Sequence, residues 1–250
     1  MFTRRQFLQA GMAALALNLL PLSSAQGQRA RIIRRGRTDR PQVALTFDDL
    51  WDEFYALRVG RILYDRGVQA TFFPAGRAIR ANIERPTFAH EHLYRRLLDM
   101  GHEFGNHTLT HPDITDLSAQ RLVWWEITPW QEALEEALGE PYETVAFRPP
   151  LGIVTPALYD AILRTGNLPI ALWSVDLRDT LCAPQDCAAA ILSLFERNLA
   201  NGCIYLQHTV RATAEVLDTQ IDMLAAANLE PVPLSVLIAA LDEPDPTPSG

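Results

Sequence analysis

Short apolar runs alternate along the chain with longer stretches in which apolar residues recur at helical spacing. The apolar runs predict strands at 42–47, 69–73, 102–106, 143–147, 168–174, 203–207 and 229–233. The periodic stretches predict helices at 53–67, 89–100, 118–138, 156–165, 186–200, 213–228 and 234–241. Because strands that alternate with helices form parallel sheets with crossover helices, we expect an α/β fold. Seven such units, with no internal repeat and no second domain, indicate a closed or nearly closed barrel in a single domain.

The beginning of the chain has a different pattern. Twin arginines, Arg4 and Arg5, precede an apolar stretch at 10–22 and small residues that end at Ala25. This arrangement resembles a twin-arginine export signal that is cleaved before Gln26. An N-terminal membrane anchor is the alternative, but the apolar run is short for a bilayer span, and no later run is long enough.

These patterns divide the chain into four parts. We expect residues 1–25 to be a signal peptide, 26–40 an Arg-rich linker, 41–242 the folded domain and 243–250 a disordered tail rich in Pro. The mature protein is then expected to be periplasmic or otherwise exported from a bacterium by the twin-arginine machinery. No stable membrane insertion is expected after the signal is cleaved.

Composition and charge narrow the choice of ligand. The 250 residues are 48% hydrophobic, which is enough for one large core. The net charge is −8, and every basic residue is Arg. Six of these arginines lie between 29 and 40, so the rest of the chain is more acidic than the total indicates. The balance argues against a nucleic-acid partner and favours a neutral or cationic ligand.

The three cysteines do not have the spacing of a zinc ribbon. Cys182 and Cys187 flank a short loop that contains a proline, and an oxidising compartment would allow them to pair. Cys203 opens an apolar run, which is typical of a buried core thiol.

Two adjacent carboxylates end the first predicted strand. Its apolar run, Val43 to Phe47, is followed directly by Asp48 and Asp49. Neighbouring residues of a strand point to opposite faces, so one carboxylate can bind a cation while the other accepts a proton. The alternative is a polar turn followed by a helix cap, where Asp is common.

A pair of histidines follows the third predicted strand. His107 and His111 are four residues apart, so on a helical turn they would lie on one face and bind one cation together. Asp49 offers a third ligand of a suitable type at a neighbouring strand end. Two nitrogens and one carboxylate leave positions open for water and substrate, as in catalytic zinc sites, although other divalent metals fit as well.

Later strand ends supply further charged groups. Arg148 offers a permanent charge that would hold Asp48 ionised, and Leu151 carries the first N–H donor after two prolines. Alternatively, this segment is a rigid turn with a surface Arg. His208 ends the sixth strand and can protonate a leaving group if a carboxylate, for which we choose Asp179, orients it and raises its pKa.

The ordered set TFDD, HTLTH, RPPLG, WSVDLRD and LQH resembles the five motifs of the polysaccharide deacetylase family. This family is also known as the NodB-homology domain or carbohydrate esterase family four, and the resemblance covers about 42–208. It implies a distorted (β/α)7-type barrel and a metal-dependent hydrolase, with Zn²⁺ as the expected metal. The implied reaction removes acetyl groups from N-acetylated or O-acetylated glycans.

The resemblance also implies a role for each matching residue. The metal ligands would be Asp49, His107 and His111. The general base would be Asp48, held by Arg148, and the general acid would be His208, tuned by Asp179. The acetyl pocket would be lined by Leu206, and the N–H of Leu151 would help to stabilise the oxyanion.

Some positions depart from the family pattern. Leu50 stands where the family usually has Gly, and it is followed by Trp51, which either stacks on a sugar or covers the mouth of the barrel. Leu151 replaces a frequent Tyr, and Thr180 a frequent Trp. These changes bear on the glycan preference more than on the reaction. Two alternatives stay open: a hydrolase of non-sugar amides on the same barrel, or a catalytically silent, exported glycan-binding protein.

Overall fold

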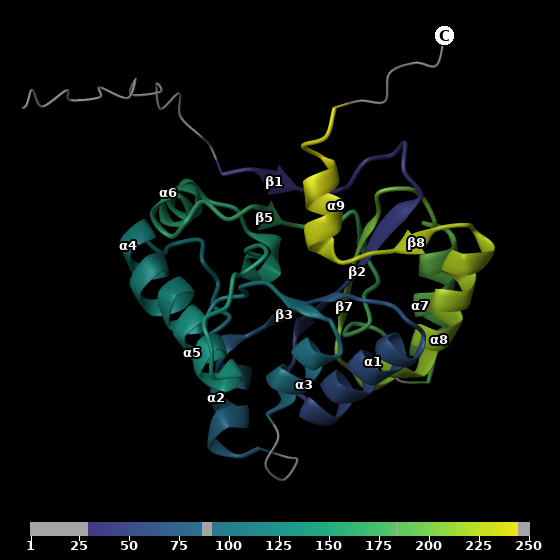
Figure 1. The fold of residues 1–250 in the computed structure, drawn as a ribbon, viewed down its shortest axis with the longest axis horizontal. Helices are drawn as coiled ribbons and strands as arrows, with labels where there is room; N and C mark the ends of the chain where they lie inside the picture. Colours follow the sequence, from purple (N-terminus) through teal and green to yellow (C-terminus); the bar gives the residue numbers. More distant parts are fainter. Residues whose placement is uncertain (1–29, 87–91, 184, 245–250) are drawn as a thin grey trace, which may run out of the picture.

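The paired strands all run parallel, and helices lie outside them (Figure 1). The computed structural model describes residues 30–86, 92–183 and 185–244. Its strands are β1 (Ile32–Ile33), β2 (Gln42–Asp49), β3 (Thr71–Pro74), β4 (Glu103–Phe104), β5 (Ile170–Ala171), β6 (Val175–Asp176), β7 (Ile204–His208) and β8 (Glu230–Pro231). Its α-helices are α1 (Glu53–Asp65), α2 (Gly76–Glu84), α3 (Leu93–Asp99), α4 (Ala119–Arg121), α5 (Thr128–Leu138), α6 (Pro156–Arg164), α7 (Cys187–Glu196), α8 (Arg211–Ala226) and α9 (Leu234–Ala240). A π-helix, η1 (Leu122–Ile127), joins α4 to α5, and a 3-10 turn, η2 (Pro150–Gly152), precedes α6.

Strand β2 is the centre of the main sheet, whose order is β4-β3-β2-β7-β6. β8 pairs with the beginning of β2, and β1 pairs with β5. Phe147 bridges Asn106, just after β4, to Ile170 of β5, and the same segment then continues into β6. Single bridges at Phe147 therefore connect the β4 end of the main sheet to β5, and the chain after β5 rejoins the main sheet where β6 pairs with β7. The predicted fold class, an α/β fold of the distorted barrel type, is confirmed.

The alternation of side chains along β2 separates an outer core from the interior of the barrel. Val43, Leu45 and Phe47 pack outward against apolar side chains of α1, α3, α5, α7 and α8. Ala44 points the other way and joins a cluster with Phe73, and the next inward residues of the strand are Thr46 and Asp48. The inward face thus changes from apolar to polar toward the end of β2, where the candidate chemistry lies.

The predicted elements are present, with differences that have physical causes. The strand expected at 143–147 is reduced to the bridge at Phe147, and the prolines that follow Arg148 have no N–H with which to continue a ladder beyond it. The strand expected at 168–174 is reduced to β5, which pairs with β1, and β6 follows just beyond the expected range, where the chain pairs with β7 instead. The helix expected at 118–138 is interrupted by the π-helix.

Two elements were not predicted. Helix α2 has a polar sequence and no side-chain cap; its first N–H groups, from Gly76 and Arg77, donate to the carbonyls of Thr108 and Leu109 instead. Strand β1 lies within the expected linker at 26–40, and its pairing with β5 makes this part of the linker a component of the fold.

The expected signal peptide at 1–25 lies outside the described residues, as do 26–29 and 245–250. Among the helices that the structure describes, none combines the length and apolar character needed to cross a bilayer.

Candidate active site

The two carboxylates at the end of β2 point to different neighbours. Asp48 keeps the strand geometry and faces the barrel interior, while Asp49 and Leu50 both adopt left-handed backbone conformations, with φ of 72° and 60°. Non-glycine residues rarely take this conformation unless the surrounding structure requires it. The backbone turn therefore redirects Asp49 and gives each carboxylate its own set of contacts.

Arg148 is fully buried and fixes Asp48. Its guanidinium donates to Asp48 Oδ1 at 2.7 Å and to Thr46 Oγ1 at 2.8 Å, both on β2. It also donates to the carbonyls of Ala171 (3.2 Å) and Leu172 (3.3 Å), and it lies 4.1 Å over the ring of Phe73. Burial lowers the pKa of the guanidinium, and the Asp48 carboxylate acts against that shift. The alternative of a surface Arg in a rigid turn is excluded.

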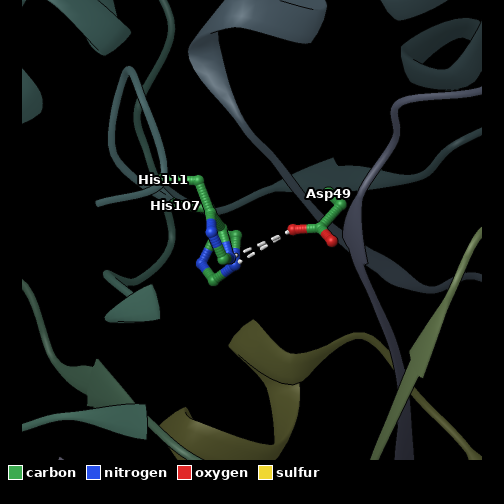
Figure 2. A group of neighbouring side chains, drawn as sticks. All are labelled: Asp49, His107 and His111. Carbon is green, nitrogen blue, oxygen red and sulfur yellow. Dashed lines mark ion pairs between the residues drawn. The ribbon is translucent and has the colours of Figure 1, made fainter. Parts of the chain in front are cut away.

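Asp49, His107 and His111 form a candidate metal centre. Asp49 Oδ1 lies 3.5 Å from His107 Nε2 and 3.4 Å from His111 Nε2, and three potential ligand atoms of the group lie within 4.8 Å of one another. Figure 2 shows the two imidazoles side by side, with nitrogens directed toward the carboxylate. Asp49 Oδ1 is buried and has no hydrogen-bond partner among the described residues. A buried carboxylate oxygen without a donor is well explained by a cation, because an unsatisfied buried charge is costly.

A second contact of Arg148 prepares His107 for metal binding. The backbone carbonyl of Arg148 lies 2.7 Å from His107 Nδ1, so this nitrogen carries the proton and Nε2 presents its lone pair to the site. The same Nε2 lies 3.7 Å from Asp48 Oδ2, which brings the second carboxylate to the edge of the metal centre without making it part of the group.

The loop that carries the two histidines is not the helical turn expected from their spacing. Thr108 and His111 have φ of 66° and 53°, and the residues between them form a bend. The N–H of Thr108 donates to Asn106 Oδ1, and the N–H of His111 donates to Thr108 Oγ1. These bonds fold the loop so that the ring centroids lie 4.9 Å apart. The pairing of the rings was predicted correctly, and its structural basis was not.

The protonation states around this group suit metal ligands, which must be ionised carboxylate and neutral imidazole. Burial raises the pKa of Asp49, but its contact with His107 and the charges of His107, His111 and His208 outweigh burial, so the pKa lies below its usual value. Burial and the neighbouring His107 lower the pKa of His111. The residues present fit Zn²⁺: two imidazole nitrogens and one carboxylate are three ligands, which leave coordination positions open for water and substrate.

His208 lies beside Asp48 in register across β2 and β7, and Asp179 holds it in place. The carboxylate of Asp179 accepts from the His208 N–H at 2.6 Å, from Thr213 Oγ1 at 2.5 Å, and pairs with His208 Nδ1 at 2.8 Å. Burial lowers the pKa of His208, but the hydrogen bond and charge of Asp179, together with Asp48 and Asp49, raise it to about 9. The ring is therefore protonated at neutral pH in the absence of a bound cation.

The remaining predicted residues surround this centre. Leu206 is buried on β7, two residues before His208 and therefore on the same face of the strand. Leu151 lies on the turn after Arg148 with φ of 58°, and its side chain is exposed. Cys182 and Cys187 form a disulfide, whose sulfurs lie near the carbonyl of Asp179, and Cys203 is a buried free thiol.

Sequence reasoning missed the residues whose hydrogen bonds position the histidine loop and Asp179. Asn106 precedes His107 and donates to the carbonyl of Ile127, and Thr213 lies on α8 and donates to Asp179; both are single polar residues with a partner in a distant segment. Glu126 was also missed: its carboxylate accepts from the N–H and the hydroxyl of Thr110, inside the histidine loop. Each lies in a segment with no motif of its own, so no local signal pointed to it.

Comparisons with known proteins agree with this geometry. The family model for polysaccharide deacetylases matches residues 35–168, which include the metal group and Arg148 but end before His208. A chitooligosaccharide deacetylase of Sinorhizobium fredii is 32% identical over 218 residues, covering 85% of this chain and 91% of that protein. The peptidoglycan-N-acetylglucosamine deacetylase PgdA of Listeria monocytogenes is 31% identical over 206 residues, 82% of this chain. The chain spans only 40% of that protein's length.

Among solved structures, a similar fold occurs in a Bacillus anthracis pseudoenzyme of carbohydrate esterase family four. A mutant of that protein with restored enzymatic activity has a TM-score of 0.74 and 26% identity. The match covers 84% of this chain and 72% of the mutant. Similarity of fold therefore accompanies both an inactive protein and an active one, and the site residues of each chain decide between them.

The metal group gives a direct prediction. Replacing His107 with Ala removes one of two nitrogen ligands, so the purified His107→Ala protein should lose its bound zinc after dialysis, as measured by elemental analysis. Asp48→Asn is the matched control: it neutralises the neighbouring carboxylate outside the group and should keep the ion. Equal zinc contents in the wild type and His107→Ala, or loss of the ion in both variants, would contradict the assignment.

Proposed function

The chain belongs to the polysaccharide deacetylase family, and we propose that it is a metal-dependent hydrolase that removes acetyl groups from N-acetylated or O-acetylated glycans. The observation that carries this proposal is the grouping of three units at one end of the barrel. A two-His, one-carboxylate set lies beside a second carboxylate that a buried Arg holds, and beside a histidine that a buried carboxylate holds.

Each group has a distinct part in the proposed reaction. Asp49, His107 and His111 would hold a divalent cation, which would supply Lewis-acid chemistry toward the acetyl carbonyl and the attacking water. Asp48 takes the proton from that water. Arg148 binds Asp48 Oδ1 at 2.7 Å and so fixes the carboxylate, and Asp48 Oδ2 lies 3.7 Å from His107 Nε2 at the edge of the metal centre.

The leaving group and the developing charge need their own partners. His208 donates a proton to the departing nitrogen or oxygen, and Asp179 keeps its ring oriented and charged for this step. We assign the N–H of Leu151 to the oxyanion and the side chain of Leu206 to the wall of the acetyl pocket. The first of these roles follows from the position of the turn next to Arg148, and the second from the face of β7 that Leu206 shares with His208.

The remaining proposals concern where the protein acts and on what. We propose that residues 1–25 direct export through the twin-arginine machinery and that the mature protein acts in the periplasm on an acetylated glycan. The relatives named for peptidoglycan and chitooligosaccharide deacetylation support this class of substrate. The acidic balance of the chain argues against a nucleic-acid partner.

The experiment that tests the function is acetate release by residues 26–250. The substrates are chitooligosaccharides, peptidoglycan, acetylated xylan and an aryl acetate, each with added zinc and with chelator. We expect chelator-sensitive release from at least one glycan, and a loss of several orders of magnitude in Asp48→Asn, because the base is removed while the metal stays.

The other outcomes would each overturn part of the proposal. Release in Asp48→Asn close to that of the wild type would contradict the base assignment. No release from any glycan by zinc-loaded protein would favour a non-sugar amide as the substrate. No release and no bound metal would favour a silent glycan-binding protein.

The pKa of His208 predicts a pH effect. As the general acid, His208 must be protonated to donate its proton. Asp179 raises the pKa of His208, so activity should fall as the pH rises through that pKa. Asp179→Asn removes the charge that raises the pKa, so the alkaline limb of kcat/KM should move to lower pH by about one unit or more.

The control for this measurement is Asp160→Asn on helix α6, an exposed carboxylate far from His208 in the sequence and on a different element. Its alkaline limb should coincide with that of the wild type. An unchanged limb in Asp179→Asn, or a shift to higher pH, would show that His208 is not the acid whose titration limits the reaction.

A further inference from the structure

We propose that Trp51 is a platform on which a pyranose ring of the substrate stacks, directly beside the metal centre. This inference rests on the proposed function, which it deepens by naming a residue that selects sugars over small acetyl compounds. Trp51 is 53% exposed, and its ring lies edge-on to the imidazole of His111, with centroids 6.5 Å apart. A single exposed aromatic is common on protein surfaces, so it is the position next to a metal ligand that carries the argument.

The backbone on both sides fixes Trp51 in this position. On one side, Leu50 has a left-handed conformation yet is only 1% exposed, so burial of its side chain stabilises an otherwise unfavourable turn. On the other side, Asp52 caps helix α1 by accepting from the N–H groups of Phe54 and Tyr55. The backbone of Trp51 is therefore held between a buried residue and a helix cap, which limits the ordering that binding a ligand on this residue requires.

The chemistry of an indole suits a sugar. A pyranose presents C–H groups on its faces and hydroxyls at its edge, so it can bury an apolar face on an aromatic ring while its hydroxyls stay in water. An acetylated sugar whose acetyl carbonyl lies at the metal group would place its own ring or the next one within reach of Trp51. A small aryl acetate needs only the metal centre and gains much less from this surface.

The test compares Trp51→Ala with the wild type on a chitooligosaccharide and on an aryl acetate. We expect kcat/KM for the oligosaccharide to fall about tenfold more than kcat/KM for the aryl acetate, mainly through KM, because stacking contributes to binding. Trp51→Phe should recover part of the loss. The control is Tyr64→Ala, a similarly exposed aromatic at the opposite end of α1, which should behave like the wild type.

The outcomes separate this inference from the proposed function. Suppose that the wild type releases acetate from the glycan. If Trp51→Ala then lowers kcat/KM equally for both substrates, or for neither, the platform is wrong and the proposed function stands. If the wild type releases none, binding of the oligosaccharide to wild type and Trp51→Ala, measured by calorimetry, decides. Equal affinities, or no binding to either, would overturn the platform.

A different observation supports a second inference, on the histidine loop. We infer that Glu126 is a positioning residue for the metal ligand His111. Glu126 is 6% exposed, and its carboxylate accepts from the N–H and from Oγ1 of Thr110, both at 2.8 Å. Its backbone carbonyl accepts from the N–H of Leu109 at 3.0 Å. Glu126 thus binds the two residues that precede His111 with both its side chain and its main chain.

The element that carries Glu126 is unusual. It lies on the π-helix η1, a rare conformation that is often found at functional sites. On the other side of the loop, Gly76 and Arg77 at the start of α2 donate to the carbonyls of Thr108 and Leu109. The loop is therefore clamped between two helices, and Glu126 supplies the clamp on the side of the π-helix. Such supporting groups commonly change metal affinity by about 10–100-fold.

The test is zinc affinity, measured by competition with a chelator on the full chain. Glu126→Gln loses an acceptor for Thr110, so its zinc affinity should fall at least about tenfold. Thr110→Val removes only the hydroxyl contact and should have a smaller effect of the same sign. Glu132→Gln, an exposed carboxylate on α5, is the control and should match the wild type.

A structural role would give a different result. If Glu126→Gln lowers the melting temperature of the metal-free protein while its zinc affinity stays that of the wild type, the inference is wrong. If Glu126→Gln does not fold, Thr110→Val decides, because it leaves the carboxylate and its bond to the Thr110 N–H in place. An unchanged zinc affinity in Thr110→Val would then contradict the inference.

Discussion

The ion pair between Arg148 and Asp48 is the interaction on which the arrangement of the site depends. A fully buried charge is tolerated only with a partner and with hydrogen bonds to its polar atoms, and Arg148 has Asp48 as its partner and a hydrogen bond from each of its side-chain nitrogens. Its guanidinium links β2 to the carbonyls of Ala171 and Leu172, and its own carbonyl orients His107. One residue therefore fixes the carboxylate assigned as the base and one of the ligands assigned to the metal.

The division of work between Asp48 and Asp49 follows from how β2 ends. Within the strand, alternation directs Asp48 into the barrel, where the only way to bury a carboxylate is to pair it. The left-handed turn at Asp49 and Leu50 then separates the second carboxylate from the first. Burial of Leu50 stabilises that turn, and the same turn leaves Trp51 exposed beside His111. The end of β2 and the turn after it therefore set both the separation of the two carboxylates and the exposure of Trp51.

Much of this could be predicted from the sequence, because it depends on local patterns. Apolar runs placed β2, β3 and β7, and the spacing of the two histidines predicted that they would meet Asp49. What could not be predicted depends on contacts between distant segments. Helix α2 begins where loop carbonyls accept its N–H groups, β1 exists because β5 offers an edge, and the histidine loop is held by bonds to Glu126 on the π-helix. None of these partners has a local sequence signal.

The most direct test of the account is the position of a bound metal. Crystals of residues 26–250 grown with zinc, with data collected at the zinc absorption edge, would locate the ion by its anomalous scattering. The account predicts one strong peak between the Asp49 carboxylate and the Nε2 atoms of His107 and His111. Asp48 should stay paired with Arg148 and outside the coordination sphere. A peak elsewhere, or a zinc ion bound by Asp48 in place of Asp49, would contradict the proposed division between metal ligand and base.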